Sequence, residues 1–193
     1  MAEIVHTQAK RLYESISEIA GSEKANVILD ELPLSKSPTD KKRGEWACSS
    51  CRSLCESFDS KTVESIRKNC HCKPSPQSVK QMKKLWSECG DLGEFAKKAN
   101  ENANGSFEME NSHNALIMKY PVCYCQFLKE TDVQAPIEWC YCTLGYAEDM
   151  FSRVSGKEVT CELLESIATG GKCCRIKMNL TDRLIKQDLS NLF

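Results

Sequence analysis

Cysteine is the residue that most constrains how this chain can fold. The sequence contains 13 cysteines among 193 residues. A disulfide framework is typical of much smaller secreted domains, whereas a chain of this length buries enough apolar surface to fold without cross-links. The first 21 residues carry charges at short intervals and no apolar signal-peptide core, so we expect an amphipathic helix there and a cytoplasmic protein. In that reducing compartment, an odd number of clustered cysteines indicates metal binding or catalysis rather than disulfides.

Composition narrows the class of protein. Hydrophobic residues make up 41% and charged residues 27% of the chain, and the net charge is −1, as in ordinary globular domains. No apolar run approaches the roughly 20 residues that span a bilayer, so we expect no membrane insertion. Residues 36–84 hold twelve Lys and Arg against five Asp and Glu, but these cations alternate with apolar residues, as on a solvated helix face. We therefore expect no nucleic-acid partner.

The first hundred residues follow the period of an α-helix. Apolar residues recur every three or four positions from Ala9 to Ile19, and Gly21 is suited to end that helix. Further helices are expected from Ser22 to before Pro33, from Ser37-Pro38-Thr39-Asp40 towards Phe58, from Asp59 or Ser60 past Ile66, from Ser75-Pro76 to Gly90, and over Asp91–Ala99.

The pattern changes at the turn-rich residues 102–105. Strands are predicted over Phe107–Glu110, Ala115–Tyr120, Glu158–Ile167 and Cys173–Met178, with a helix over Thr143–Val154 and a terminal helix capped by Thr181 or Asp182. We therefore predict an α+β fold with two domains: a helical region over residues 1–104, packed on an antiparallel-sheet domain with helices over residues 105–193.

Two matching Cys-x-Cys motifs are the sharpest chemical feature. In extended backbone, residues i and i+2 point the same way, so each motif can present two sulfurs to one ion. The four thiols are Cys123, Cys125, Cys140 and Cys142. Together they suit zinc, in a closed and therefore structural or regulatory site, or alternatively an iron–sulfur cluster. They also suit reduced thiols packed in the core, or redox chemistry.

Two further groups of cysteines have spacings of interest. Cys48, Cys51 and Cys55 share one face of a predicted helix, which favours packing but also allows two or three ligands. Cys70 and Cys72, at a helix end, form a second metal candidate together with His71 or a cysteine of the first group.

Motifs for familiar enzyme classes are missing from the sequence. It contains no Gly-x-Gly-x-x-Gly, P-loop, Gly-x-Ser-x-Gly or His-Glu-x-x-His pattern. A cysteine-dependent redox enzyme stays open as an alternative, because Lys172 and Arg175 flank Cys173-Cys174 and such charges lower a thiol pKa. No catalytic residue can be assigned, and we favour a binding protein over an enzyme.

The carboxyl half carries motifs of a known domain. Gly145 and Tyr146 begin a helix that ends before Gly156, Glu165 closes a strand, and Ala168 and Gly170 precede Cys174 in the pattern Ala-x-Gly-x-x-x-Cys. In this arrangement residues 106–178 resemble the 4-vinyl reductase domain and the related L-2-amino-thiazoline-4-carboxylic acid hydrolase-like family. Three positions depart from the pattern: Ser166 stands where Cys is frequent, Gly171 where Asp is, and Ile176 where Phe is.

The resemblance implies a fold that binds small molecules. Relatives of this domain serve as sensor modules for hydrophobic or tetrapyrrole-like ligands and often pair, so a homodimer is expected. The whole chain also resembles an uncharacterised, cysteine-rich prokaryotic relative. Our expectation is a cytosolic, zinc-binding protein with a small-molecule-binding or sensor-type domain. The alternatives are a cysteine-dependent redox enzyme and a metal-free binder of a small apolar ligand, the latter with a dry cavity lined from the second half of the chain.

Overall fold

A computed structural model describes residues 4–103, 105–112 and 115–180. Its contacts separate the chain into two compact units. The first unit comprises Met1–Cys72, Val122–Tyr146 and Ser166–Lys172, and the second comprises Lys73–Pro121, Ala147–Glu165 and Cys173–Phe193. This division is interleaved along the chain, unlike the single boundary that we predicted after residue 104. The terminal helix predicted from Thr181 or Asp182 lies outside the described residues.

The first unit is helical. Its elements are α1 (Thr7–Ala20), α2 (Ser22–Leu29), α3 (Asp40–Ser57), α4 (Ser60–Asn69), the short 3₁₀ helices η1 (Ile137–Cys140) and η2 (Ile167–Thr169), and the start of α7 (Tyr141–Ser155). Asp59 caps α4 as the sequence predicts, accepting hydrogen bonds from two of its backbone amides. Helix α3 starts two residues later than the Ser37-Pro38 pattern predicts, and Thr39 rather than Ser37 accepts from its first turn. Gly21 ends α1 at a φ of 90°, a backbone conformation that favours glycine.

An aromatic cluster forms much of the core of the first unit. The rings of Trp46, Phe127 and Trp139 lie with centroids 5.6 to 5.9 Å apart. Leu12 and Ile16 of α1 are fully buried in the same hydrophobic cluster. Because Phe127 and Trp139 come from residues 122–140, burying their rings brings this distant stretch of chain onto the amino-terminal helices.

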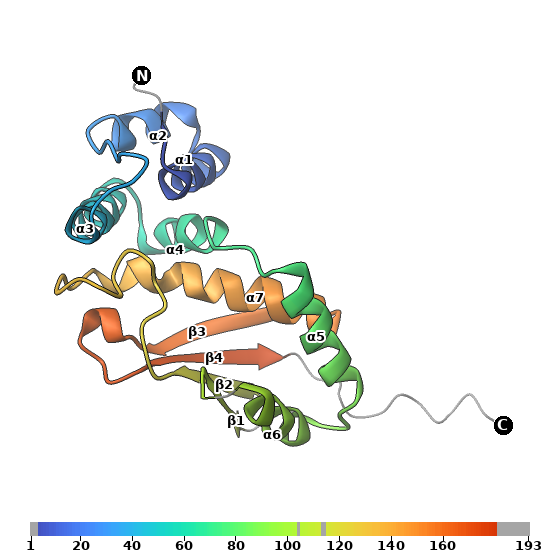
Figure 1. Ribbon diagram of the computed structural model, residues 1–193. Helices are drawn as coiled ribbons and strands as arrows, with labels where there is room; N and C mark the ends of the chain where they lie inside the picture. The colour runs from blue at the N-terminus through green and yellow to red at the C-terminus, as the bar shows by residue number, and fades with distance from the viewer. Residues whose placement is uncertain (1–3, 104, 113–114, 181–193) are drawn as a thin grey trace. The chain divides into compact units, whose positions relative to one another are not determined.

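The second unit contains a four-stranded antiparallel sheet. Its strands are β1 (Glu108–Ser112), β2 (Ala115–Tyr120), β3 (Val159–Glu165) and β4 (Cys174–Leu180), in the order β1-β2-β4-β3 (Figure 1). Leu116 pairs with Met178 across the central strands, and both side chains are fully buried. The α+β fold class and the antiparallel sheet are therefore confirmed.

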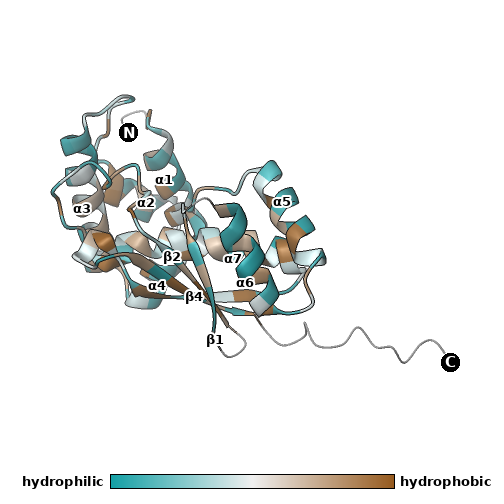
Figure 2. Ribbon diagram, turned by 60° about the horizontal axis from the view of Figure 1, so that its bottom comes forward, coloured by the Kyte–Doolittle hydropathy of each residue, from teal (hydrophilic) through white to brown (hydrophobic). Residues whose placement is uncertain are grey.

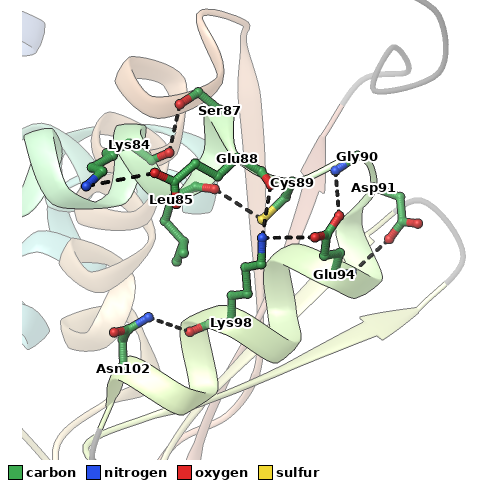
Figure 3. Close-up of polar contacts among 10 residues, drawn as sticks. All are labelled: Lys84, Leu85, Ser87, Glu88, Cys89, Gly90, Asp91, Glu94, Lys98 and Asn102. Atoms are coloured by element: carbon green, nitrogen blue, oxygen red, sulfur yellow. Dashed lines mark hydrogen bonds and ion pairs between the residues drawn. The ribbon is translucent and has the colours of Figure 1, made fainter.

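Helices α5 (Pro76–Ser87) and α6 (Leu92–Ala103) belong to the second unit and are amphipathic, with teal and brown stretches in Figure 2. Phe95 of α6 packs edge-on against Trp86 of α5 and Phe151 of α7. Figure 3 shows the corner between α5 and α6, where Glu94 accepts from the Gly90 amide at 2.8 Å and also pairs with Lys98 at 2.9 Å. This capping arrangement fixes the start of α6.

Helix α6 extends past the predicted end at Ala99, and a side chain explains why. Asn100 donates to the carbonyl oxygen of Met109 at 2.9 Å and accepts from its amide at 2.6 Å. The end of α6 is thereby held beside β1, so residues that read as a turn continue the helix to Ala103. Helix α5 instead ends earlier than predicted, at Ser87.

Candidate metal centre

Three potential ligands from two elements converge in the first unit. Cys51, Cys55 and Glu138 each offer a ligand atom, and these atoms all lie within 4.8 Å of one another. Cys51 and Cys55 are one helical turn apart on α3, so they share a face. Glu138 lies in η1, which contacts both α3 and α4. The cluster therefore depends on a tertiary contact between segments far apart in the sequence.

Burial keeps the two thiols protonated in the absence of a cation. Cys51 is fully buried, which raises its pKa to about 12. Cys55 as a residue is exposed to solvent. Partial burial of its sulfur and the charge of Glu138 nevertheless raise the pKa of its thiol as well. The Cys51 thiol donates a hydrogen bond to the Cys55 sulfur. A bound divalent cation would displace these protons, since a thiol that coordinates a metal is deprotonated.

The donor set has a clear chemical preference. Two sulfurs and a carboxylate oxygen are ligands that zinc accepts, and three protein ligands leave a fourth position open. Tyr141 is close enough for the cluster to affect its phenol. Burial raises the pKa of this phenol, and the charges of Glu138, Glu64 and Cys55 raise it further. The site is thus half-exposed, with one buried and one accessible thiol.

A buried arginine stands behind the cluster. Arg67 of α4 is fully buried, its Nη2 donates to the Trp139 carbonyl at 2.8 Å, and its guanidinium carbon lies 3.8 Å from the centre of the Trp139 ring. Its Nη1 donates to Cys70 Sγ at 3.1 Å, while Nε has no partner. Four thiols interact electrostatically with the Arg67 guanidinium: Cys70, Cys142, Cys51 and Cys125.

The predicted four-thiolate site is not assembled in the structure. Cys140 ends η1 and Cys142 lies in the first turn of α7, so their backbone is helical rather than extended. In a helix, side chains two positions apart diverge by roughly 200° around the axis. Cys140 Sγ instead lies 3.2 Å from Ser166 Oγ. Cys123 and Cys125 pack, partly buried, against the hydrophobic core. No three of these four sulfurs form a ligand group among the described residues. Zinc binding by all four stays a prediction.

The second predicted metal site also has diverging ligands. Cys70 accepts from buried Arg67, whereas exposed Cys72 accepts from Arg11 Nη1 at 3.4 Å. His71 Nδ1 lies 2.6 Å from the Lys68 carbonyl oxygen, which can only accept, so this nitrogen carries the proton. These three residues form no ligand group in the part of the chain that the structure describes.

The residues of the predicted carboxyl-half motif lie in α7, at the end of η2 and at the start of β4. Gly145 of α7 lies against the backbone of Lys68, and Gly170 ends η2 at a φ of 92°. Tyr146 follows Gly145 in α7, and Cys174 begins β4, where it pairs with Tyr120.

Several cysteines outside the cluster are held in their protonated form by burial. Burial raises the pKa of Cys48, Cys70, Cys89, Cys142 and Cys173 in addition to those of the cluster. Cys173 donates to Glu165 Oε2 at 3.4 Å, an arrangement that favours its protonated form. Reactive cysteines need a lowered pKa, and these five thiols have the opposite shift. A cysteine-dependent redox enzyme stays a prediction.

A cavity of about 620 Å³ lies in the first unit, lined by residues from the first 49 of the chain. Leu29, Leu34 and Trp46 contribute apolar surface, while Lys42 and Glu45 are among its polar lining residues. This volume falls in the range of small-molecule sites. This cavity lies outside the second half of the chain, where the metal-free alternative predicts one.

Sequence reasoning missed Glu138 and Arg67. The position of Arg67 was a usable signal, since it lies at the apolar spacing of α4 with Val63, Ile66 and Cys70. A cation on a buried stripe indicates a paired or functional group. Nothing local distinguishes Glu138 from other acids.

Comparison with known proteins assigns this chain to a family. Residues 1–185 match the family of unknown function DUF6144. The chain therefore belongs to this family. No curated protein matches. Among solved structures, trafficking protein particle complex subunit 3 from Naegleria fowleri, covalently bound to palmitic acid, is 11% identical with a TM-score of 0.45. That match covers 76% of this chain and 98% of the other, and a score this low does not establish a shared fold.

No helix of the described residues is long and apolar enough to cross a bilayer.

Proposed function

We propose that this protein binds a thiophilic divalent metal ion, zinc above all, through Cys51, Cys55 and Glu138. The observation that carries the proposal is the convergence of their three ligand atoms within 4.8 Å. An i, i+4 pair on a helix joined by a ligand from another segment is a common way to build a metal site.

The donor set and its exposure favour a regulatory role. Iron–sulfur clusters are typically held by four cysteine thiolates, whereas this group offers two sulfurs and one oxygen. Closed structural zinc sites take four protein ligands, so an open position and an exposed Cys55 suit an ion that can exchange. A reducing, cytoplasmic setting would keep both thiols available.

Metal content of the protein tests the proposal. Tag-free protein purified without oxygen or chelator should contain about one zinc ion per chain. Cys51→Ala and Glu138→Gln should each lower zinc retention, whereas Cys89→Ala, a thiol of the second unit, is the matched control. Loss of zinc in Cys123→Ala and Cys140→Ala, with full retention in Cys51→Ala, would favour the paired Cys-x-Cys motifs instead. Protein that binds no metal would overturn the proposal.

Small-molecule binding is the second candidate function. The cavity of about 620 Å³ favours it. An apolar ligand of drug-like size would contact Leu29, Leu34 and Trp46. Mass spectrometry of an organic extract of the purified protein tests this candidate, and Leu34→Trp, which fills the cavity, should abolish co-purification.

A further inference from the structure

We infer that Arg67 is a positioning residue for the Cys51–Cys55–Glu138 centre: it holds η1, and with it the Glu138 carboxylate, against α4. This inference rests on the proposed function. It assigns a role to a buried cation that neither the family nor the sequence motifs explain.

The charge of Arg67 needs a counter-charge. A guanidinium stays protonated in proteins, and an unpaired buried charge is costly. The guanidinium of Arg67 contacts a thiol, a backbone carbonyl and an aromatic ring, none of which carries a formal charge when Cys70 is protonated. Burial raises the pKa of Cys70 despite the opposing effect of Arg67.

A loaded centre would provide that counter-charge. Two thiolates and one carboxylate around a divalent ion leave one net negative charge. Arg67 interacts electrostatically with Cys51, the buried ligand of the cluster. The centre carries one net negative charge in both states, with zinc and two thiolates or with two protonated thiols and the Glu138 carboxylate, so one guanidinium balances it in each.

The geometry also makes Arg67 a support for Glu138. Its Nη2 bonds to the carbonyl oxygen of Trp139, the residue after Glu138, and its plane lies over the Trp139 ring. Trp139 is almost fully buried in the aromatic cluster. Arg67 thus fixes the segment that carries the carboxylate, as partners outside the ligand shell do in many metal sites.

Zinc affinity of Arg67 variants tests the inference. Zinc is titrated against a competing chelator in the full-length chain, comparing Arg67→Met, Arg67→Lys and the matched control Lys61→Met, an exposed cation on the same helix. We expect Arg67→Met to weaken zinc binding by about 10- to 100-fold. Arg67→Lys should lose less, because it keeps the charge, and Lys61→Met should bind as the parent does.

A second readout separates positioning of Glu138 from simple packing. Glu138→Gln weakens the ligand that Arg67 positions, so Arg67→Met should cost less affinity in that background than in the parent. Equal zinc affinity in the parent and Arg67→Met overturns the inference and leaves the proposed function standing. Equal losses in both backgrounds also overturn the positioning role, because Arg67 would then act independently of Glu138. A parent protein that binds no zinc overturns the proposed function itself. If Arg67→Met does not fold, Arg67→Lys is compared with the protein that keeps Arg67, once with Glu138 and once with Glu138→Gln. Equal zinc affinity in both comparisons overturns the positioning role.

Discussion

Gly145 of α7 lies directly against the backbone carbonyl of Lys68 at the end of α4, so close that a Cβ atom on Gly145 would overlap the carbonyl oxygen. The neighbouring atoms are backbone and cannot rotate away. This contact sets how closely the start of α7 approaches the helix that carries Arg67.

Gly145→Ala should destabilise the protein. Alanine is the better helix former by about 1 kcal/mol, yet the overlap with Lys68 should outweigh that gain, with a net loss of about 1–3 kcal/mol. Urea denaturation followed by circular dichroism measures it. Gly44→Ala is the control, because its Cβ would meet only the Thr131 side chain, at 3.1 Å. Equal stability of Gly145→Ala and the parent would contradict the tight approach.

Zinc should stabilise the protein and protect one thiol. At a free zinc concentration 100-fold above Kd, stability should rise by about 2.7 kcal/mol. Alkylation followed by peptide mass spectrometry should label exposed Cys55 and Cys72 first in metal-free protein. Zinc should then slow labelling of Cys55 and leave Cys72 unchanged. Protection of Cys72 instead would point to the site around residues 70–72.

Stability of the metal-free protein should fall in alkali. The folded-state pKa of Cys51 is raised from 9.0 to about 12, so the folded chain holds a proton that the unfolded chain releases. Its contribution is complete below the unfolded pKa and is lost as pH rises through the folded value. Cys51→Ala should therefore lose less stability between about pH 8 and about pH 11. Parallel profiles for variant and parent would contradict the buried thiol.

Asn100 should matter for the junction of α6 and β1. Asn100→Ala removes both hydrogen bonds to the Met109 backbone and should cost about 1–3 kcal/mol. Asn100→Asp keeps an acceptor for the Met109 amide and loses only the donor, so its loss should be smaller. Hydrogen exchange at the Met109 amide reports the change locally, and unchanged protection in Asn100→Ala would refute the role.

The amino-acid sequence by itself determined most helix starts and the strands of the sheet region, but not which strands pair. Asp59 and Ser75 cap helices where predicted, because a cap needs only the backbone amides of the next three residues. Alternation and turns in the second half likewise predicted β1 to β4 within a few residues. These are short-range effects, legible in windows of a few residues.

Only the tertiary structure decided which cysteines meet. Glu138 joins Cys51 and Cys55 because burial of Trp139 brings η1 onto α3 and α4, a contact between residues far apart in the chain. The same packing winds Cys140 and Cys142 into helical backbone, so the sulfurs that an extended chain would align diverge. Side-chain burial over long sequence separation, rather than local spacing, therefore selects the candidate ligands.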